Sequence, residues 1–146
     1  LRFNIDIKTE DALENTIKII KEMKCFDRSC LASFSSSRLN RIRKLAGPGA
    51  CTSSGQMDIV KLICKSLGIT LKINSADCAQ IPITQWAVPI LTKRFLRIAK
   101  KENKLVHVWT IDNKEEMFKL IDFGVDGIMT DDAELLKNVC LKSNLF

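Results

Sequence analysis

The segments on either side of one predicted helix constrain the fold of this chain most. Residues 105–111, Leu-Val-His-Val-Trp-Thr-Ile, have the composition of a buried strand, and residues 127–130, Gly-Ile-Met-Thr, predict a second short strand. Between them, apolar residues recur at helical spacing, at Met117, Leu120 and Ile121. Gly124 then provides a stop signal for this helix. A strand, a helix and a second strand in this order form the unit of a parallel α/β fold.

Strand and helix alternate about five times along the whole chain, which predicts a parallel sheet covered by helices. Further strands are expected at residues 3–8, 29–35, 50–53 and 78–82. Further helices are expected near residues 10–24, 37–46, 55–67, 92–103 and 132–139. Residues 84–89 are interpreted as irregular. Since no low-complexity linker interrupts the pattern, we predict a single domain over residues 1–146.

Polar residues that precede the apolar stripes predict where the helices begin. Thr9 is expected to cap the first helix, Ser36 or Ser37 the second, and Asp131 or Asp132 the last. Asp112 and Glu115 have the spacing of a capping box. The inward faces are predicted from helical spacing: Leu13, Ile17 and Ile20, then Leu39, Ile42 and Leu45, then Met57, Val60 and Ile63 or Cys64.

The chain has 23 basic and 17 acidic residues, which gives a net charge of +6. The densest cationic run is Lys93, Arg94, Arg97, Lys100, Lys101 and Lys104. Most of these residues share one face of a predicted helix, which is typical of a solvated surface helix. The arginines do not alternate repeatedly with aromatic residues, and the chain has no tyrosine, so we predict no nucleic-acid partner. A nucleic-acid or anionic-surface binder, with an affinity that falls steeply with salt, is the last-ranked hypothesis.

The six cysteines form no Cys-x-x-Cys pair, and the chain has one histidine, which argues against a zinc site of the usual ligand type. The cysteines are interpreted as small buried hydrophobes in a reducing compartment. No apolar run approaches the roughly 18 residues of a membrane span, so we predict no transmembrane segment. We predict a cytoplasmic location, although a missing N-terminal segment would also hide a signal peptide.

Asp6 and Lys8 are the first candidates for chemistry. Two residues apart on a predicted strand, their side chains point to the same side. At the carboxyl end of that strand, they could bind a divalent cation, Mg²⁺ or Ca²⁺, together with a phosphate. The alternative is an ion pair, or a solvent-facing pair without a ligand.

Five motifs together resemble the glycerophosphodiester phosphodiesterase family. They are Asn-Ile-Asp-Ile-Lys at 4–8, Ala-Ser-Phe-Ser at 32–35, Ala-Gln-Ile-Pro at 79–82, Val-Trp-Thr-Ile-Asp at 108–112 and Gly-Val-Asp-Gly-Ile-Met-Thr-Asp at 124–131. The resemblance extends from Asn4 to about Leu136. It implies a (β/α)8 TIM barrel, of which this sequence covers roughly the C-terminal half to two-thirds.

The resemblance also implies roles for single residues. Asp6 matches a metal ligand of the family, although Asp replaces Glu there, and Lys8 matches a lysine of the substrate site. Trp109 is similar to a tryptophan that lines the pocket near the glycerol end, and Phe34 is expected to line the site. The family's catalytic histidines lie in the front part of its barrel, and the His-Arg-Gly motif is absent from this sequence. His107 is therefore interpreted as structural, and no catalytic residue is assigned.

The resemblance implies metal-dependent hydrolysis of a small-molecule glycerophosphodiester to glycerol 3-phosphate and an alcohol when the barrel is complete. The chain begins at Leu1, so we expect a truncated or processed protein. The alternative is an inactive barrel fragment that binds a partner or self-associates as a homo-oligomer, since an open sheet exposes its edges.

Overall fold

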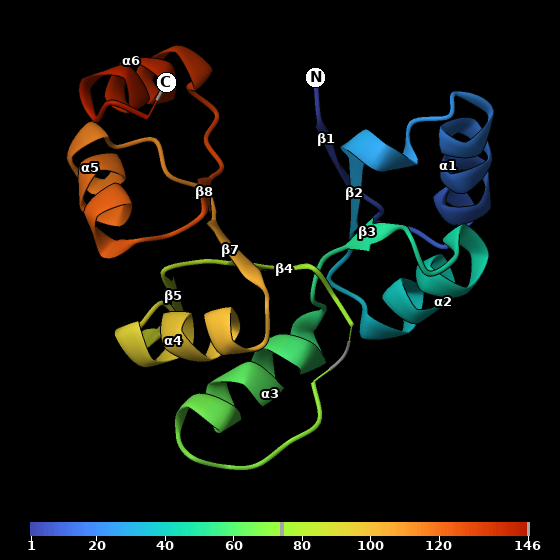
Figure 1. The fold of residues 1–146 in the computed structure, drawn as a ribbon, viewed down its shortest axis with the longest axis horizontal. Helices are drawn as coiled ribbons and strands as arrows, with labels where there is room; N and C mark the ends of the chain where they lie inside the picture. The colour runs from blue at the N-terminus through green and yellow to red at the C-terminus, as the bar shows by residue number, and fades with distance from the viewer. Residues whose placement is uncertain (74, 146) are drawn as a thin grey trace. The chain divides into compact units, whose positions relative to one another are not determined.

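The chain forms two compact units, Leu1–Ala79 and Gln80–Phe146, in a computed structural model that describes residues 1–73 and 75–145 (Figure 1). Both units alternate strands with helices, and the strands whose pairing is described are parallel apart from one short hairpin. The predicted parallel α/β class is thereby confirmed. The single domain over residues 1–146 stays a prediction.

The first unit contains a parallel sheet in the order β1-β2-β3. Its strands are β1 (Phe3–Asp6), β2 (Ser29–Ala32) and β3 (Cys51–Thr52), and its helices are α1 (Asp11–Glu22), η1 (Phe26–Arg28), α2 (Ser36–Ala46) and α3 (Gln56–Ser66). Asp6 pairs with Ala32, so the carboxyl ends of β1 and β2 lie at one edge. This edge holds the first candidate residues.

The core of the first unit lies between this sheet and the helices α1 and α2. It contains Ile7, Leu13, Ile17, Ile20, Cys25, Leu31, Leu39 and Ile42. The predicted stripe of α1 is confirmed because all three of its apolar residues are buried. Strand residues Ile7 and Leu31 supply the sheet side of the core.

The second unit contains most of a sheet in the order β4-β7-β8. Its elements are β4 (Cys78–Ile81), which begins in the first unit, β5 (Thr84–Gln85), β6 (Val88–Pro89), α4 (Lys93–Lys101), β7 (Leu105–Val108), α5 (Lys114–Phe123), β8 (Gly127–Ile128) and α6 (Ala133–Lys142). Val106, Val108, Phe95 and Met117 are fully buried. No helix in the described ranges is both long and apolar enough to cross a bilayer.

Two of the predicted inward faces are wrong in part. Leu39 and Ile42 of α2 are buried, but Leu45 is exposed. Each step of three residues turns by only about 300°, so Leu45, the third residue of this stripe, lies off the buried face. In α3, Met57 and Val60 are exposed.

The inward face of α3 is set by Asp58 and Leu62, which are both buried. The Asp58 carboxylate accepts a hydrogen bond from the Gly55 backbone N–H at 3.2 Å, which satisfies a free donor at the helix start. Asp58 and Leu62 are one helical turn apart and define the buried face, so Met57 and Val60 lie outside it.

Three predicted caps move by one residue. Ser35, rather than Ser36 or Ser37, caps α2, and Asn113, rather than Asp112, caps α5. Glu10 stands at the cap position of α1, while Thr9 Oγ1 still accepts a hydrogen bond from Ala12 N at 3.4 Å. Asp132 caps α6, which was one of the two expected residues.

Residues 84–89 form a hairpin and are not irregular. Thr84 pairs with Pro89 and Gln85 with Val88 in an antiparallel ladder. The two turn residues, Trp86 and Ala87, have positive φ values of 47° and 63°. Positive φ values at both central positions define a type I′ turn, the turn that suits a two-residue hairpin. Glycine or asparagine usually occupies these two positions. The sequence has neither residue here, so it gives no turn signal.

Replacing Gly124 with alanine is expected to lower the free energy of unfolding by about 1–2 kcal/mol. Gly124 ends α5 in the left-handed conformation, at φ 88° and ψ 36°. A Cβ there would meet no atom within 4 Å, so the cost arises from the backbone alone. Gly49→Ala is the control, since that site is equally open and has no positive φ in the left-handed range. Urea denaturation that gives equal losses for both variants would contradict this explanation.

Candidate functional site

Asp6 and Lys8 lie at the carboxyl end of β1, where Asp6 is the last strand residue. The Lys8 Nζ atom is 3.9 Å from Asp6 Oδ2, and the side chains are 80% and 35% exposed. The ion pair considered from the sequence is therefore present, and the two side chains share one side of the strand. An exposed ion pair of this length contributes little stability, so both groups stay accessible to a ligand.

The backbone between these two residues is held in place by hydrogen bonds. Ile7 N donates to Ala32 O at 2.8 Å, which continues the ladder with β2. Ile7 O accepts bonds from Ser33 Oγ at 2.8 Å and from Arg38 Nη1 at 3.2 Å. Three partners thus fix the segment that presents Asp6 and Lys8.

Arg38 is a positioning residue that the sequence analysis missed. Its side chain is 16% exposed, and its Nε atom lies 3.3 Å from Glu10 Oε1. Its Nη1 atom also donates to Ser33 Oγ at 2.9 Å. Arg38 therefore links the residues after β1, the end of β2 and the first turn of α2. It lies 28 residues from Glu10 within a polar helix, so no local pattern identifies it.

Phe34 follows β2 by two residues and is 56% exposed. Its backbone carbonyl accepts a hydrogen bond from Gln56 N at 3.1 Å, which joins this loop to the start of α3. Since Asp6 pairs with Ala32, Lys8 and Phe34 are each two residues beyond the same register position. The structure therefore places Asp6, Lys8 and Phe34 at one sheet edge.

Trp109 lies at the carboxyl edge of the sheet in the second unit. It follows β7 directly, is partly buried, and donates its backbone N–H to Ile81 O at 3.1 Å. Trp109 thus lies beside the last residue of β4 and directly after β7 in the sequence. It belongs to a different unit from the other three candidates.

Asp112 joins the loops that follow β7 and β8. Its Oδ1 atom accepts bonds from Thr130 Oγ1 at 2.7 Å and from Asp131 N at 2.8 Å. The Thr130 bond, with the backbone bonds, holds the pKa of Asp112 below its usual value. Asp112 was predicted to cap a helix, but it fixes the loop that carries the Thr-Asp motif.

A comparison with protein families decides the class of this chain. Residues 4–135 match the model of the glycerophosphoryl diester phosphodiesterase family. The chain belongs to this family. The resemblance found from the five motifs is confirmed.

Two relatives named as glycerophosphodiester phosphodiesterases match nearly the whole of this chain. In each of them, the match covers only part of the relative's length. A Mycobacterium tuberculosis protein named "Probable glycerophosphodiester phosphodiesterase 2" is 33% identical over 97% of this chain and 55% of the relative. A glycerophosphodiester phosphodiesterase from Caldanaerobacter subterraneus is 31% identical over 95% of this chain and 55% of its own length. The chain therefore spans about half the length of these family members.

A solved structure shows the same fold. The crystal structure of a glycerophosphodiester phosphodiesterase from Parabacteroides distasonis superposes with a TM-score of 0.71 and 23% identity. The match covers 97% of this chain and 58% of that one. The chain thus has the fold of one part of a family member. The share of a barrel, half to two-thirds, stays a prediction.

The described residues do not make a complete cation site. Within 1–73 and 75–145, no three His, Cys, Asp or Glu side chains converge to hold a metal ion. Asp6 offers one accessible carboxylate, which suits Mg²⁺ or Ca²⁺, but these ions take six or more ligands. A cation bound at Asp6 would therefore need further ligands.

His107, the one histidine of the 146 residues, is partly buried, and its ring packs against Gly127 of β8. It pairs with Gly127, where an added Cβ would lie 2.8 Å from the His107 Cδ2 atom. Burial lowers the pKa of His107, and Asp126 only partly opposes this. This environment supports the structural interpretation.

We expect stability to fall as the pH decreases below about 6.5, in part through His107. Its folded-state pKa is lowered, so the folded protein binds the proton less readily than the unfolded chain does. The contribution is complete above the unfolded pKa of about 6.5 and is lost as the pH falls through the folded value. Urea denaturation of the His107→Gln variant should show a weaker pH dependence. If the pH dependence of stability is unchanged in His107→Gln, groups other than His107 cause it.

Proposed function

We propose that this chain is part of an enzyme that hydrolyses glycerophosphodiesters to glycerol 3-phosphate and an alcohol. The family match over residues 4–135 carries this proposal. The accessible Asp6–Lys8 pair at the carboxyl end of β1 supports it, because parallel α/β folds hold their active sites at that end. The cytoplasmic location stays a prediction.

Lys8 is proposed to contact the phosphate of the substrate. Its ammonium group is 80% exposed and has only a 3.9 Å ion pair, so it can turn toward an incoming anion. A positive charge at this position stabilises the negative charge that builds up on the phosphoryl oxygens. Ser33 and Arg38 hold the backbone from which Lys8 projects.

Trp109 and Phe34 are proposed to contact the carbon atoms of the substrate. The partly buried indole of Trp109 offers a flat apolar wall to the glycerol carbons. Phe34, at the same edge as Lys8, has an exposed ring for the same purpose.

Asp6 is proposed as one ligand of a divalent cation, Mg²⁺ or Ca²⁺, which would polarise the phosphoryl oxygens. Its further ligands would come from the part of a family barrel that this chain does not match. The general acid and base are also assigned to that part, since the ring of His107 is partly buried against Gly127 of β8.

The test is the release of glycerol 3-phosphate from glycerophosphocholine by the complete barrel protein that contains this chain, with Mg²⁺, with Ca²⁺ and with a chelator. Hydrolysis that needs the cation and drops about 100-fold or more in Asp6→Asn supports the proposal. Asp11→Asn, in the exposed first turn of α1, is the matched control and should keep full activity. No hydrolysis at any cation concentration overturns the proposal in favour of an inactive, binding or self-associating barrel fragment.

A further inference from the structure

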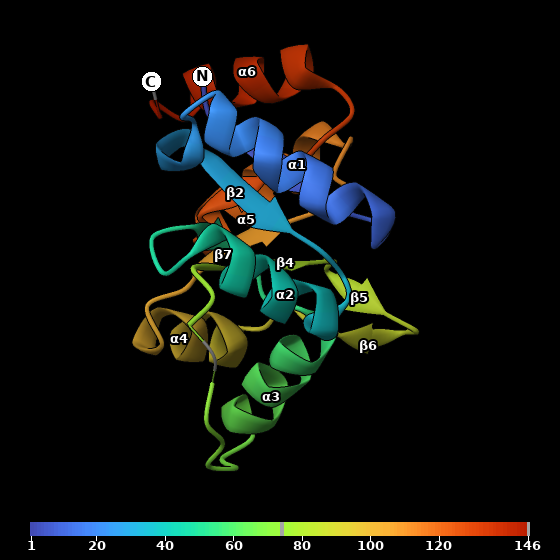
Figure 2. The same cartoon turned by 90° about the vertical axis from the view of Figure 1, so that its right-hand side faces the viewer.

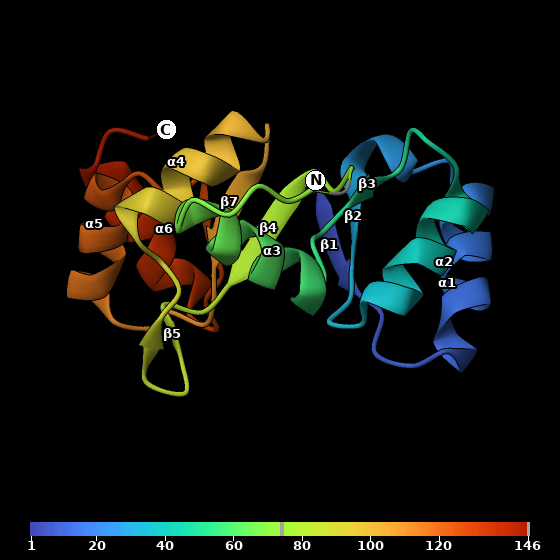
Figure 3. The ribbon, with the colours of Figure 1, turned by 90° about the horizontal axis from the view of Figure 1, so that it is seen from below.

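The hairpin of residues 84–89 presents an apolar tip to solvent. All six residues are exposed, with Trp86 at 89% and Val88 at 57%. The surrounding segment, residues 78–92, contains no charged residue, in a chain of which 27% is charged. Figures 2 and 3 show the hairpin projecting from the rest of its unit. Trp86 and Val88 thus form an exposed apolar patch within an uncharged segment, and such patches mark interaction sites.

The tip is held by the backbone and is not a loose loop. The β5–β6 ladder fixes both arms, and Ile83 O accepts bonds from Ile90 N at 2.9 Å and from Leu91 N at 3.1 Å. These two bonds close the base of the hairpin one residue before Thr92, which caps α4. The hairpin and α4 are therefore directly joined.

The helix that follows has a cationic face, formed by Lys93, Arg94, Arg97, Lys100 and Lys101. Phe95 and Ala99 are buried. At about 100° per residue, the five cations fall within an arc of about 120° opposite those two residues. The whole solvent side of α4 is thus positively charged.

Most of the excess charge of the chain is concentrated here. Residues 83–104 contain six basic residues and one acidic residue, so they hold five of the six net positive charges. Lys93 already has a partner within the chain. Its Nζ donates a hydrogen bond to Phe123 O at 2.9 Å and lies 4.0 Å from the Phe123 ring centre. Among the described residues, no carboxylate forms an ion pair with the four other cations. They remain available for an external anion.

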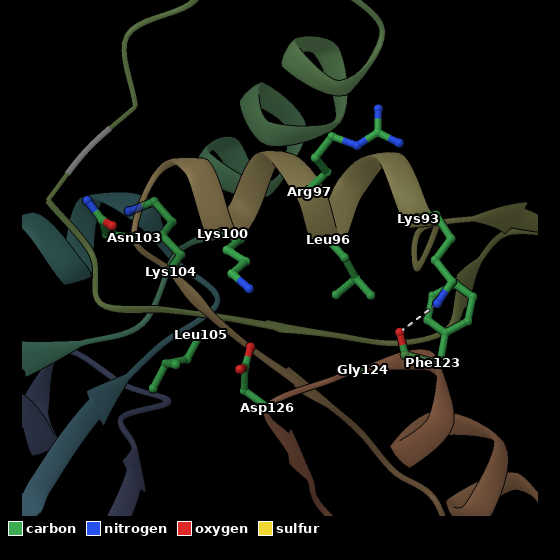
Figure 4. Close-up of a pocket in the computed structure, with 10 residues that line it drawn as sticks. All are labelled: Lys93, Leu96, Arg97, Lys100, Asn103, Lys104, Leu105, Phe123, Gly124 and Asp126. Carbon is green, nitrogen blue, oxygen red and sulfur yellow. Dashed lines mark hydrogen bonds between the residues drawn. The ribbon is translucent and has the colours of Figure 1, made fainter.

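A hollow of about 560 Å³ beside α4 is not the proposed binding site. Figure 4 shows Lys100 and Leu96 directed into it and Arg97 directed away from it. Asp126 also lines this hollow and would repel an anion. The exposed cations Arg94, Arg97 and Lys101, rather than the hollow, are the anion-binding groups.

We propose that the hairpin tip and the cationic face of α4 form a docking surface for an anionic phospholipid bilayer. Tryptophan favours the interface between water and acyl chains, and basic residues on a neighbouring surface bind lipid phosphates. A nucleic acid would favour aromatic side chains interleaved with the cations, but here the apolar and cationic groups lie in separate, adjacent segments. The inference does not depend on the proposed hydrolysis.

Sedimentation with vesicles tests the cationic face. The chain should bind vesicles of phosphatidylcholine mixed with phosphatidylglycerol, release them at high salt, and bind pure phosphatidylcholine weakly. The triple variant Arg94→Gln, Arg97→Gln, Lys101→Gln should bind about 100-fold more weakly. The control Lys114→Gln, Lys119→Gln removes exposed charges from α5 and should bind nearly as well as the native chain. Equal losses in the two variants would overturn the assignment to α4.

The tip is tested by its tryptophan. Trp86→Ala should bind about 10-fold more weakly, whereas Leu67→Ala, which removes a 66% exposed side chain after α3, should not. In Trp109→Phe, Trp86 is the one tryptophan of the 146 residues, and its fluorescence should shift to the blue with anionic vesicles. An unshifted emission, or tighter binding to DNA or RNA than to vesicles at equal salt, would overturn the proposal.

Discussion

Replacing Leu39 with alanine is expected to lower the free energy of unfolding by about 2–5 kcal/mol. Leu39 of α2 is fully buried with Leu31 of β2 and Ile42 of its own helix. Its Cδ1 atom also lies where α3 begins, 3.1 Å from the position of a Cβ on Gly55. The variant would lose apolar burial and leave a cavity where the sheet and two helices meet. Urea denaturation followed by circular dichroism measures the loss.

Leu45→Ala in the same helix is the matched control. Leu45 is 52% exposed, so its truncation should change the free energy of unfolding by less than about 0.5 kcal/mol. Both variants carry the same side-chain change in one helix, so helix propensity affects them alike. Similar losses at the two positions would mean that the core of the first unit is not centred on Leu39.

The same pair of leucines shows which parts of the fold can be predicted from sequence. The alternation of strands and helices is predicted because it depends on long, repeated apolar patterns. The direction of a single side chain is less certain, because a residue at the margin of a stripe is buried only if a neighbouring element covers it. In α3 the buried Asp58 settles the inward face, and that contact is invisible to a pattern of apolar residues.

The hairpin was missed for a different reason. Turn prediction relies on glycine and asparagine, which adopt positive φ at little cost. Trp86 and Ala87 adopt it here without that signal. The pairing of β5 with β6 and the closure at Ile83 hold these residues in place, and such contacts exist only in the folded chain.

The candidate site shows a similar division. Asp6 and Lys8 could be predicted because their i, i+2 spacing on a strand places both side chains on one side. Phe34 joins them at the same edge through the parallel register of β1 and β2. Arg38 and Ser33 could not be found in this way, because they act on the carbonyl oxygen of Ile7, a backbone atom that every residue possesses.

Replacing Arg38 with methionine is expected to lower the free energy of unfolding by about 1.5–3 kcal/mol. The substitution removes the charged hydrogen bonds to Ile7 O and Ser33 Oγ and the contact with Glu10. Methionine keeps most of the aliphatic volume of arginine. The loss in free energy of unfolding therefore measures the missing polar contacts and not a cavity. If the proposed hydrolysis is correct, kcat should also fall, because the segment that presents Asp6 and Lys8 loses one of its supports. Urea denaturation and the glycerol 3-phosphate assay measure the two effects.

Arg41→Met separates this role from general surface charge. Arg41 also contacts Glu10, and its Nη2 lies 3.2 Å from Glu14 Oε1, but its side chain is 49% exposed and it does not contact Ile7. Its loss should cost less than about 1 kcal/mol and leave kcat unchanged. Arg38→Lys should recover only part of the stability, since one ammonium group cannot reproduce the planar set of donors that reaches Ile7, Ser33 and Glu10 together. Full recovery by lysine would mean that charge alone, and not the geometry of the guanidinium, holds the end of β1.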